Sequence, residues 1–159
     1  MSVETASACL ARYGRQQDIL FFDRSSATVE LAAQALHTEG CRIAKTLSFL
    51  TKEGPILVVT AGDARIDNAR YKARVGQKAK MLTPDQVVEW TTHPVGGVYP
   101  FGVPENVTVY LDESLRRFET VYPACGSGNS AICLTCDELY TYGGATGWVD
   151  VCKGWRDEE

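Results

Sequence analysis

The sequence predicts an α+β fold: one compact domain in which a mixed, curved β-sheet is flanked by helices. Segments with helical periodicity alternate with short strand-like segments, and two of the strand candidates are close enough to form a hairpin. The 159 residues, 45% of them hydrophobic, are enough for a full core. No linker or repeat divides the chain, so we expect a single domain over residues 1–159, with a frayed polar tail from about 154 to 159.

The first half of the chain is predicted to contain two helices and three strands. Ser25 and Ser26 are candidate caps for the second helix, and Gly40 is expected to stop it. A short turn-rich link, residues 51–55, suggests that the strands on either side of it pair as an antiparallel hairpin. The predicted elements are a helix over 3–13, a strand over 18–23, a helix over about 27–38, and strands over 43–50 and 56–60.

The second half has clearer signals for helix ends than for strands. Gly76 is expected to end a helix, and Thr83, Pro84 and Gln86 have the order of a capped helix start. Thr135 is the expected cap of the last helix. The predicted elements are helices over 67–75, 84 to about 91 and 136 to about 141, and strands over 107–111, 119–122, 131–134 and 148–151.

Charge and cysteine content exclude several classes of protein. The net charge of −4 argues against bulk binding to polyanions such as DNA, and no apolar run is long enough to span a membrane. The N-terminus lacks a signal-peptide pattern, so we expect a cytoplasmic protein whose six cysteines are free thiols. Cys133 and Cys136 form a C-x-x-C, but no second close pair completes a ligand set, so we expect no metal.

A basic segment lies between residues 65 and 80, where six Lys and Arg residues accompany one acid, Asp67. The segment could be a solvated helix face or a contact for nucleic-acid phosphates. The sequence alone favours the solvated face, because Tyr71 is the only aromatic residue among these charges that could stack on a base.

Lys45 is the first candidate for chemistry. With a period of two it shares a strand face with Ile43, Leu47 and Phe49, and this more apolar face is expected to point inward. An inward lysine either extends its ammonium to solvent past a packed stem, or lies in a cleft as a cation, a base or a nucleophile. Periodicity leaves both interpretations open.

Two glycine-containing loops are the next candidates. Residues 96–102 begin with Gly96-Gly97, whose backbone N–H groups could face a ligand oxygen, and residues 126–130 could form a backbone nest for an anion. Each loop taken alone is more often a plain turn. No Ser-His-Asp order, dinucleotide fingerprint or H-E-x-x-H motif is present.

These features occur in an order that resembles the YbaK/EbsC family, a domain also found inserted in or associated with prolyl-tRNA synthetases. The resemblance covers about residues 25–151, and the three motifs in order carry it rather than any one of them. The first motif is Ile43-Ala44-Lys45-Thr46-Leu47, together with residues 61–67 that follow it. The second is residues 96–102, and the third is the bend before Ser130-Ala131-Ile132. The resemblance implies a barrel-like mixed sheet and an aminoacyl-tRNA deacylase that acts in trans.

The resemblance also implies roles for particular residues. Lys45 matches the family's essential lysine and would hold substrate oxygens, while Gly96 and Gly97 would stabilise the oxyanion, without metal or cofactor. The expected partner is the acceptor end of an aminoacyl-tRNA, with prolyl-tRNA synthetase as a second partner. Substrate contacts are expected from Thr46, Asp67, Val98, Tyr99, Pro100, Gly126, Ser127, Ser130 and Ala131. Contacts to tRNA are expected from Arg70, Lys72 and Arg74. If the substrate is a tRNA, contact with its phosphates explains the basic segment as well as a solvated helix face does.

Substrate identity stays open at this point. In the cysteine-specific members an acidic residue stands at the position of Ala131, just before the apolar residue that corresponds to Ile132. Ala131 cannot hold an amino group by charge, whereas Thr46 matches those members. The expected substrate is therefore a proline tRNA carrying Cys, Ala or another small amino acid. The alternatives are a non-catalytic module that binds an aminoacyl or nucleotide group, and a hydrolase of small esters.

Overall fold

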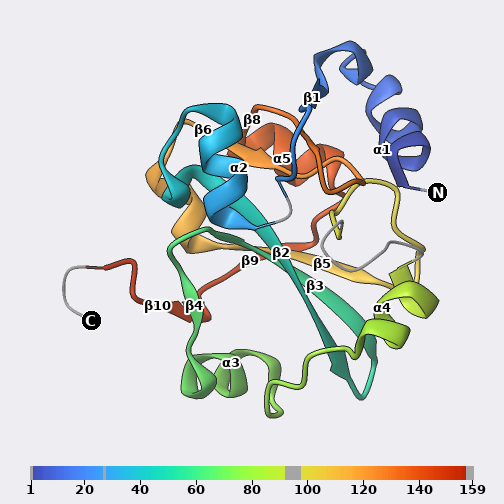
Figure 1. The fold of residues 1–159 in the computed structure, drawn as a ribbon. Helices are drawn as coiled ribbons and strands as arrows, with labels where there is room; N and C mark the ends of the chain where they lie inside the picture. The colour runs from blue at the N-terminus through green and yellow to red at the C-terminus, as the bar shows by residue number, and fades with distance from the viewer. Residues whose placement is uncertain (1, 27, 92–97, 157–159) are drawn as a thin grey trace.

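The computed structural model describes residues 2–26, 28–91 and 98–156. A six-stranded mixed sheet in the order β8-β6-β2-β3-β5-β9 runs through the molecule (Figure 1). The long hairpin β2–β3 is antiparallel; β6 is parallel to β2, and β5 is parallel to both β3 and β9. The strands are β2 (Ile43–Thr51), β3 (Gly54–Ala61), β5 (Thr108–Asp112), β6 (Thr120–Pro123), β8 (Leu134–Thr135) and β9 (Gly147–Val149). The predicted α+β class with a mixed, curved sheet is confirmed.

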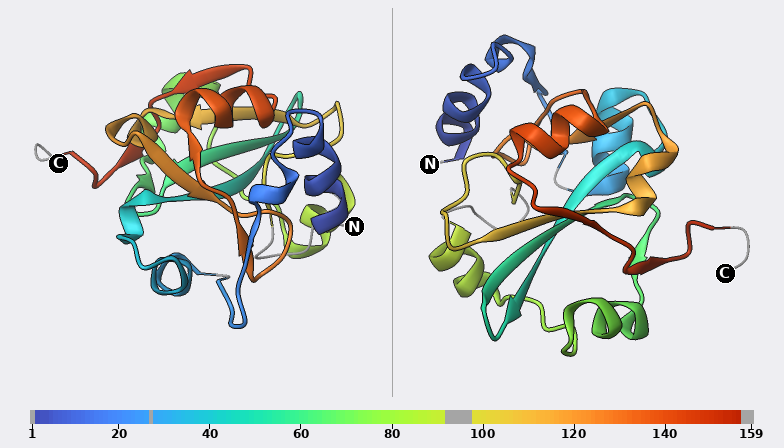
Figure 2. Two further views of the ribbon diagram at one scale, coloured as in Figure 1. Left: turned by 90° about the horizontal axis from the view of Figure 1, so that it is seen from above. Right: turned by 180° about the vertical axis from the view of Figure 1, so that it is seen from behind.

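Helices lie on both sides of the central hairpin. In Figure 1, α2 and α5 lie above β2–β3, α3 lies below it, and α4 lies beside its turn end, and the view from behind in Figure 2 agrees. Two small antiparallel sheets, β1–β7 and β4–β10, tie distant segments together. The remaining elements are α1 (Ser2–Ala11), η1 (Gln16–Asp18), β1 (Leu20–Phe21), α2 (Val29–Leu36), η2 (Gly40–Arg42), β4 (Arg65–Ile66), α3 (Asn68–Val75), α4 (Pro84–Thr91), η3 (Glu113–Arg117), β7 (Ser130–Ala131), α5 (Cys136–Tyr142) and β10 (Cys152–Lys153).

The helix boundaries with strong local signals form as predicted. The Asp67 carboxylate accepts hydrogen bonds from the first backbone N–H groups of α3, and Gly76 ends that helix in the left-handed conformation, at a φ of 86°. Thr83 and Gln86 cap each other's backbone at the start of α4. Thr135 forms the same kind of capping box at the start of α5.

Several other predicted boundaries are wrong, and for the strands the reason is that contacts from distant segments decide them. Thr28, not Ser25 or Ser26, caps α2, and its hydroxyl accepts from the Leu31 N–H at 3.1 Å. That helix ends at His37 rather than at Gly40. The predicted strand over 131–134 is two strands, since β7 pairs with β1 whereas β8 pairs with β6. The predicted strand over 148–151 is formed only at residues 148 and 149, in β9, and β10 begins after it at Cys152.

The predicted polar tail is shorter than expected. Trp155 is half-buried and packs against the core, and the guanidinium groups of Arg117 and Arg156 lie over its ring, 5.1 and 4.2 Å from the centroid. Arg156 also pairs with Asp150 at 2.5 Å. Trp155 and Arg156 are therefore packed rather than frayed, Gly154 is exposed, and residues 157–159 lie outside the described part of the chain.

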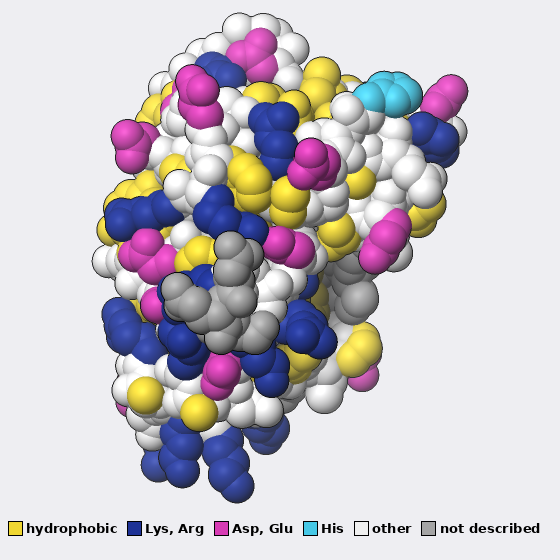
Figure 3. All heavy atoms as spheres, turned by 90° about the vertical axis from the view of Figure 1, so that its left-hand side faces the viewer, with side chains coloured by type: hydrophobic (Ala, Val, Ile, Leu, Met, Phe, Trp, Pro, Cys, Tyr) yellow, Lys and Arg dark blue, Asp and Glu magenta, His cyan; other side chains and the backbone are white. Residues whose placement is uncertain are grey.

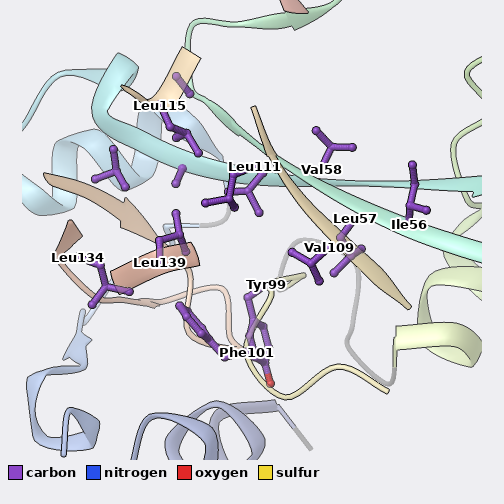
Figure 4. Packing of buried hydrophobic residues seen from close by; sticks show 14 of the residues in the cluster. Ile56, Leu57, Val58, Tyr99, Phe101, Val109, Leu111, Leu115, Leu134 and Leu139 are labelled. Atoms are coloured by element: carbon purple, nitrogen blue, oxygen red, sulfur yellow. The ribbon is translucent and has the colours of Figure 1, made fainter. Parts of the chain in front are cut away.

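The hydrophobic core lies between the centre of the sheet and α5 (Figure 4). Leu57 and Val109 come from β3 and β5, Leu139 comes from α5, and Tyr99 and Phe101 close the cluster from the segment after residue 97. β3 is buried on both faces, which fits its nearly continuous apolar sequence.

A buried polar joint fixes the end of β3. The fully buried Asp112 accepts hydrogen bonds from the backbone N–H groups of Ser114 at 3.0 Å and Val151 at 2.9 Å. The Ser114 hydroxyl in turn accepts from the Ala61 N–H at 3.1 Å. A buried carboxylate is tolerated only when such donors satisfy it. These hydrogen bonds hold the turn after Ala61 in place, and the Gly62 carbonyl in that turn forms part of the site described next.

Candidate functional site

A cavity of about 400 Å³ lies along the first two thirds of β2. This volume is in the range of small-molecule sites. Lys45 is the one charged residue among the described residues that line it. The lining comprises Ile43, Ala44, Lys45, Thr46, Leu47 and Ser48 of β2; Ser26, Thr28, Val29 and Ala32 in or before α2; Met81, Leu82, Pro84 and Val87; and Val98, Tyr122, Ala124, Ser130 and Ala131.

The cavity meets β2 along its edge. Neighbouring side chains of a strand point to opposite faces, so a cavity that lay on one face would contact every second residue. Here six consecutive residues, 43–48, line it. Both faces of β2 are buried: Ile43 and Phe49 on the face expected to point inward, and Ala44 and Ser48 on the other.

The Lys45 ammonium is half-buried and has spare donors. Its Nζ donates to the Gly62 carbonyl at 3.4 Å, a long hydrogen bond, and forms no ion pair with any carboxylate in the described parts of the chain. Burial lowers its pKa from the ordinary value, and the nearby Cys152, Asp63 and Glu30 only partly oppose this. Asp63 is itself paired with Arg117. Lys45 is thus a poorly solvated cation that can bind a ligand oxygen.

Part of the cavity wall is made by β7, which the bend before it holds in place. The Ser130 hydroxyl lies 2.8 Å from that of Ser127, which donates to the Asn129 side chain at 2.8 Å. Asn129 also pairs with the backbone of Phe22 in both directions, at 2.9 and 3.1 Å. These bonds fix the bend to the N-terminal segment, and they place Ser130 and Ala131 against the cavity.

The structure brings together part of the predicted site. Thr46, Val98, Ser130 and Ala131 line the cavity with Lys45, so the lysine lies close to the ends of both predicted loops. Gly96 and Gly97, predicted as oxyanion donors, lie outside the described residues.

Other predicted substrate contacts lie outside the lining. Tyr99 and Pro100 are buried, and burial raises the pKa of the Tyr99 hydroxyl above its ordinary value. Pro100 packs so closely on Gly143 that a Cβ there would lie 3.1 Å from the proline ring. The Asp67 carboxylate caps α3, and the backbone donors there hold its pKa below the ordinary value. Gly126 and Ser127 belong to the bend but not to the cavity lining.

The basic segment is mainly exposed, but its residues differ in their contacts. Arg70 forms an ion pair with Asp150 at 3.3 Å, and the Arg74 guanidinium lies 5.4 Å from the centroid of the Tyr110 ring. Lys72 is exposed. Figure 3 shows Lys and Arg side chains gathered on the lower half of the molecular face shown there. The segment continues from α3 to Lys80, which precedes the lining residue Met81 in the sequence.

Sequence reasoning missed the wall formed by residues 80–87. The Leu50 N–H donates to the Lys80 carbonyl at 2.8 Å, and the Leu82 N–H donates to the Ser48 carbonyl at 3.1 Å. These bonds place Met81 and Leu82 beside the cavity. The pairing is non-local and irregular, so only the capping signal at Thr83 marked this region in the sequence.

The described residues contain neither a disulfide nor a cluster of metal ligands. The six cysteines are free, and within residues 2–26, 28–91 and 98–156 no group of three or more His, Cys, Asp or Glu side chains could hold a metal ion. Over the same residues, no helix has the length and apolar character needed to cross a membrane.

Comparison with known proteins gives consistent matches. The family described as "aminoacyl-tRNA editing domain" matches residues 23–142, a range that contains every described lining residue. An uncharacterized Bacillus subtilis (strain 168) protein, YwhH, is 48% identical over 157 residues, which are 98% of this chain and 100% of that protein. A proline–tRNA ligase of Thermosipho melanesiensis is 32% identical over 90 residues, which are 56% of this chain but only 16% of the ligase.

A solved structure gives the same result. The crystal structure of a proposed trans-editing enzyme for prolyl tRNA synthetase superposes with a TM-score of 0.86 at 29% identity, covering 96% of this chain and 97% of that one.

Proposed function

Because the chain belongs to the family of aminoacyl-tRNA editing domains, we propose that it is a deacylase that hydrolyses the ester of a mischarged tRNA in trans. The substrate would be a tRNA, with proline tRNA as the first candidate, that carries Cys, Ala or another small amino acid. The match to part of a proline–tRNA ligase and the similarity to a proposed prolyl trans-editing enzyme support this choice. Prolyl-tRNA synthetase is the corresponding candidate partner.

One observation carries the proposal: a single cation, Lys45, faces an otherwise uncharged cavity among the described lining residues. An aminoacyl ester at the 3′ end of a tRNA offers a small side chain together with carbonyl and phosphate oxygens. An apolar cavity suits the side chain, and a poorly solvated ammonium suits the oxygens because the low polarity around it strengthens the attraction. The lack of any described carboxylate in the lining leaves Lys45 available for the substrate.

The proposed reaction needs no protein nucleophile. In the direct route a water attacks the ester carbonyl carbon, the bond from that carbon to the ribose 3′-oxygen breaks, and the proton lost by the water is balanced by the proton that the 3′-oxygen takes up. Attack by a thiol of the substrate breaks the same bond and releases the amino acid as a cyclic thioester, which water then opens. Attack by the ribose 2′-OH moves the ester to the 2′-oxygen, and a water must then cleave that ester. Lys45 holds the carbonyl or the terminal phosphate in place while negative charge develops. The role predicted for Gly96 and Gly97, donation from their backbone N–H groups to the oxyanion, stays a prediction.

A panel of aminoacyl-tRNAs tests this function. Proline tRNA charged separately with cysteine, alanine, serine and proline is incubated with the protein, and release of the amino acid is compared with spontaneous hydrolysis. We expect faster release from at least one mischarged tRNA than from prolyl-tRNA. Release from none of them would refute the deacylase proposal, and tight binding without release would instead identify a non-catalytic module that binds the aminoacyl end.

The basic segment gives a prediction about affinity for tRNA. If Lys72 contacts a phosphate, Lys72→Gln raises KM and reduces the slope of log affinity against log salt by about 0.7–0.9. Arg12→Gln, which removes an equally exposed charge after α1, is the matched control and should leave the slope unchanged. Adding substitutions at Arg70 and Arg74 should reduce the slope further. Equal slopes for wild type and Lys72→Gln would remove Lys72 from the tRNA-binding surface.

A further inference from the structure

The edge of β2 that borders the cavity is paired at both ends and open in the middle. β6 pairs with β2 only at Ile43 and Ala44, after which Ala124 turns away to bridge Ala131. Residues 80–82 pair with the far end of β2, with Met81 opposite Phe49. Between these two partners lie residues 45–47, at the cavity.

The backbone of Thr46 faces this open edge. Along a strand, the N–H and C=O of one residue point to the same edge, and those of the next residue point to the other. The Ser48 carbonyl and the Leu50 N–H point to the edge occupied by residues 80–82, so the Thr46 N–H and C=O point the same way. Lys45 and Leu47 point instead to their β3 partners, Thr60 and Val58.

Within the described residues, no backbone group takes the place next to Thr46 on this edge. A donor and an acceptor therefore lie side by side in the cavity wall, next to Lys45, which carries the half-buried ammonium. Such a pair matches one residue of an added antiparallel strand, which exchanges both of its backbone hydrogen bonds with the residue opposite.

We propose that the backbone of Thr46 binds the aminoacyl group of the substrate as if that group were one residue of an added strand. The inference rests on the proposed deacylase function. The α-ammonium of the aminoacyl group donates to the Thr46 carbonyl, and the Thr46 N–H donates to the ester carbonyl. Main-chain recognition of this kind holds the amino group without any acidic side chain, which Ala131 does not provide.

The main-chain contacts also account for tolerance of different small side chains. Both hydrogen bonds go to atoms that all aminoacyl esters share, so they fix the reacting carbonyl beside Lys45 whatever side chain follows. Side-chain selection is then left to the apolar walls, among them Ala32, Ala124 and Ala131.

Amide hydrogen exchange in the intact protein tests the inference directly. The probe is 3′-alanylamino-3′-deoxyadenosine, in which an amide replaces the labile ester. In the free protein the Thr46 amide should exchange about tenfold or more faster than those of Lys45 and Leu47, which are internal controls bonded within the sheet. Saturation with the probe should slow Thr46 exchange by about tenfold and leave the controls unchanged. Saturation of the shifts of the Ala131 and Val98 methyl signals would show that the probe is bound. If Thr46 exchange is not slowed under those conditions, the inference is overturned.

A proline substitution gives an independent test by activity. Thr46→Pro removes an N–H group that makes no hydrogen bond within the sheet, and strands tolerate proline at such a position. The proline ring also blocks the open edge of the strand. Thr46→Val removes the hydroxyl but keeps the N–H. We expect kcat/KM for alanyl-tRNA to be about tenfold or more lower in Thr46→Pro than in Thr46→Val.

The outcomes separate the two proposals. Equal activity of folded Thr46→Pro and Thr46→Val would overturn the main-chain contact while leaving the deacylase function intact. If Thr46→Pro does not fold, the exchange experiment on the wild type decides. A wild-type protein that releases no amino acid would refute the proposed function, and this inference with it.

Discussion

Methionine in place of Lys45 is expected to remove deacylase activity and to stabilise the fold at the same time. The substitution keeps most of the packed stem and deletes the ammonium, so the cavity loses its one described charge. Loss of a single electrostatic contact to a developing oxyanion reduces kcat by about 100-fold or more. Single-turnover release of the amino acid from the best mischarged tRNA measures this effect.

The gain in stability follows from the burial of Lys45. Its pKa is lowered in the folded state, so folding disfavours the charged form, and removal of that cost should raise the free energy of unfolding by about 0.5–2 kcal/mol. The cost is fully present below the folded-state pKa and disappears as the pH rises towards the unfolded value. Urea unfolding at neutral pH should therefore show a larger difference between Lys45→Met and wild type than unfolding at high pH.

The combination of the two effects distinguishes a functional lysine from a structural one. Lys52→Met, at an exposed position in the β2–β3 turn, is the matched control and should change neither activity nor stability. A Lys45→Met protein that is both inactive and less stable than wild type would mean that the ammonium supports the fold through Gly62. A stable variant with full activity would remove Lys45 from the mechanism.

The parts of the fold that the sequence predicted correctly are those set by local chemistry. Gly76 after α3, the pair Thr83–Gln86 at the start of α4 and Thr135 before α5 each satisfy backbone groups within one helical turn. A short turn between two apolar segments was likewise enough to predict the β2–β3 hairpin, because the interacting strands are adjacent in the chain.

The features that were missed depend on residues far apart in the sequence. Ser130–Ala131 pairs with β1 about 110 residues earlier, and this divides what the sequence suggested was a single strand. The cavity follows the β2 edge because β6 turns away at Ala124 and because Lys80 pairs with Leu50. Periodicity identified Lys45 as unusual, but it assigns side chains to faces and gives no information about which edge of a strand is left open.

Alanine in place of Gly62 is expected to be the most destabilising single-methyl change near the site. A Cβ at this position would lie 2.0 Å from the Gly40 carbonyl oxygen and 2.8 Å from Val29 Cγ1. The first of these atoms belongs to the backbone, so relief requires η2 to move away from the end of β3. Overpacking of this kind costs about 1–3 kcal/mol and occasionally more, and we expect a loss in the upper part of that range by urea unfolding.

Gly147→Ala is the matched control for Gly62→Ala. Gly147 also lies in an extended segment without a positive φ, and a Cβ there would meet only Tyr110, at an ordinary 3.8 Å. Its substitution should change the free energy of unfolding by no more than about 0.5 kcal/mol. Similar stability for the two variants would contradict the close approach of Gly62 to Gly40.

The same substitution links the packing to the chemistry. The Gly62 carbonyl is the acceptor for the Lys45 ammonium, so any shift that relieves the clash also moves the group that orients the lysine. The fraction of Gly62→Ala that remains folded should therefore show reduced kcat/KM as well. Adding Val29→Ala removes the 2.8 Å contact but not the 2.0 Å one, so it should not restore the stability lost in Gly62→Ala. Restored stability in the double variant would show that the Val29 side chain, rather than the backbone of η2, limits the space at Gly62.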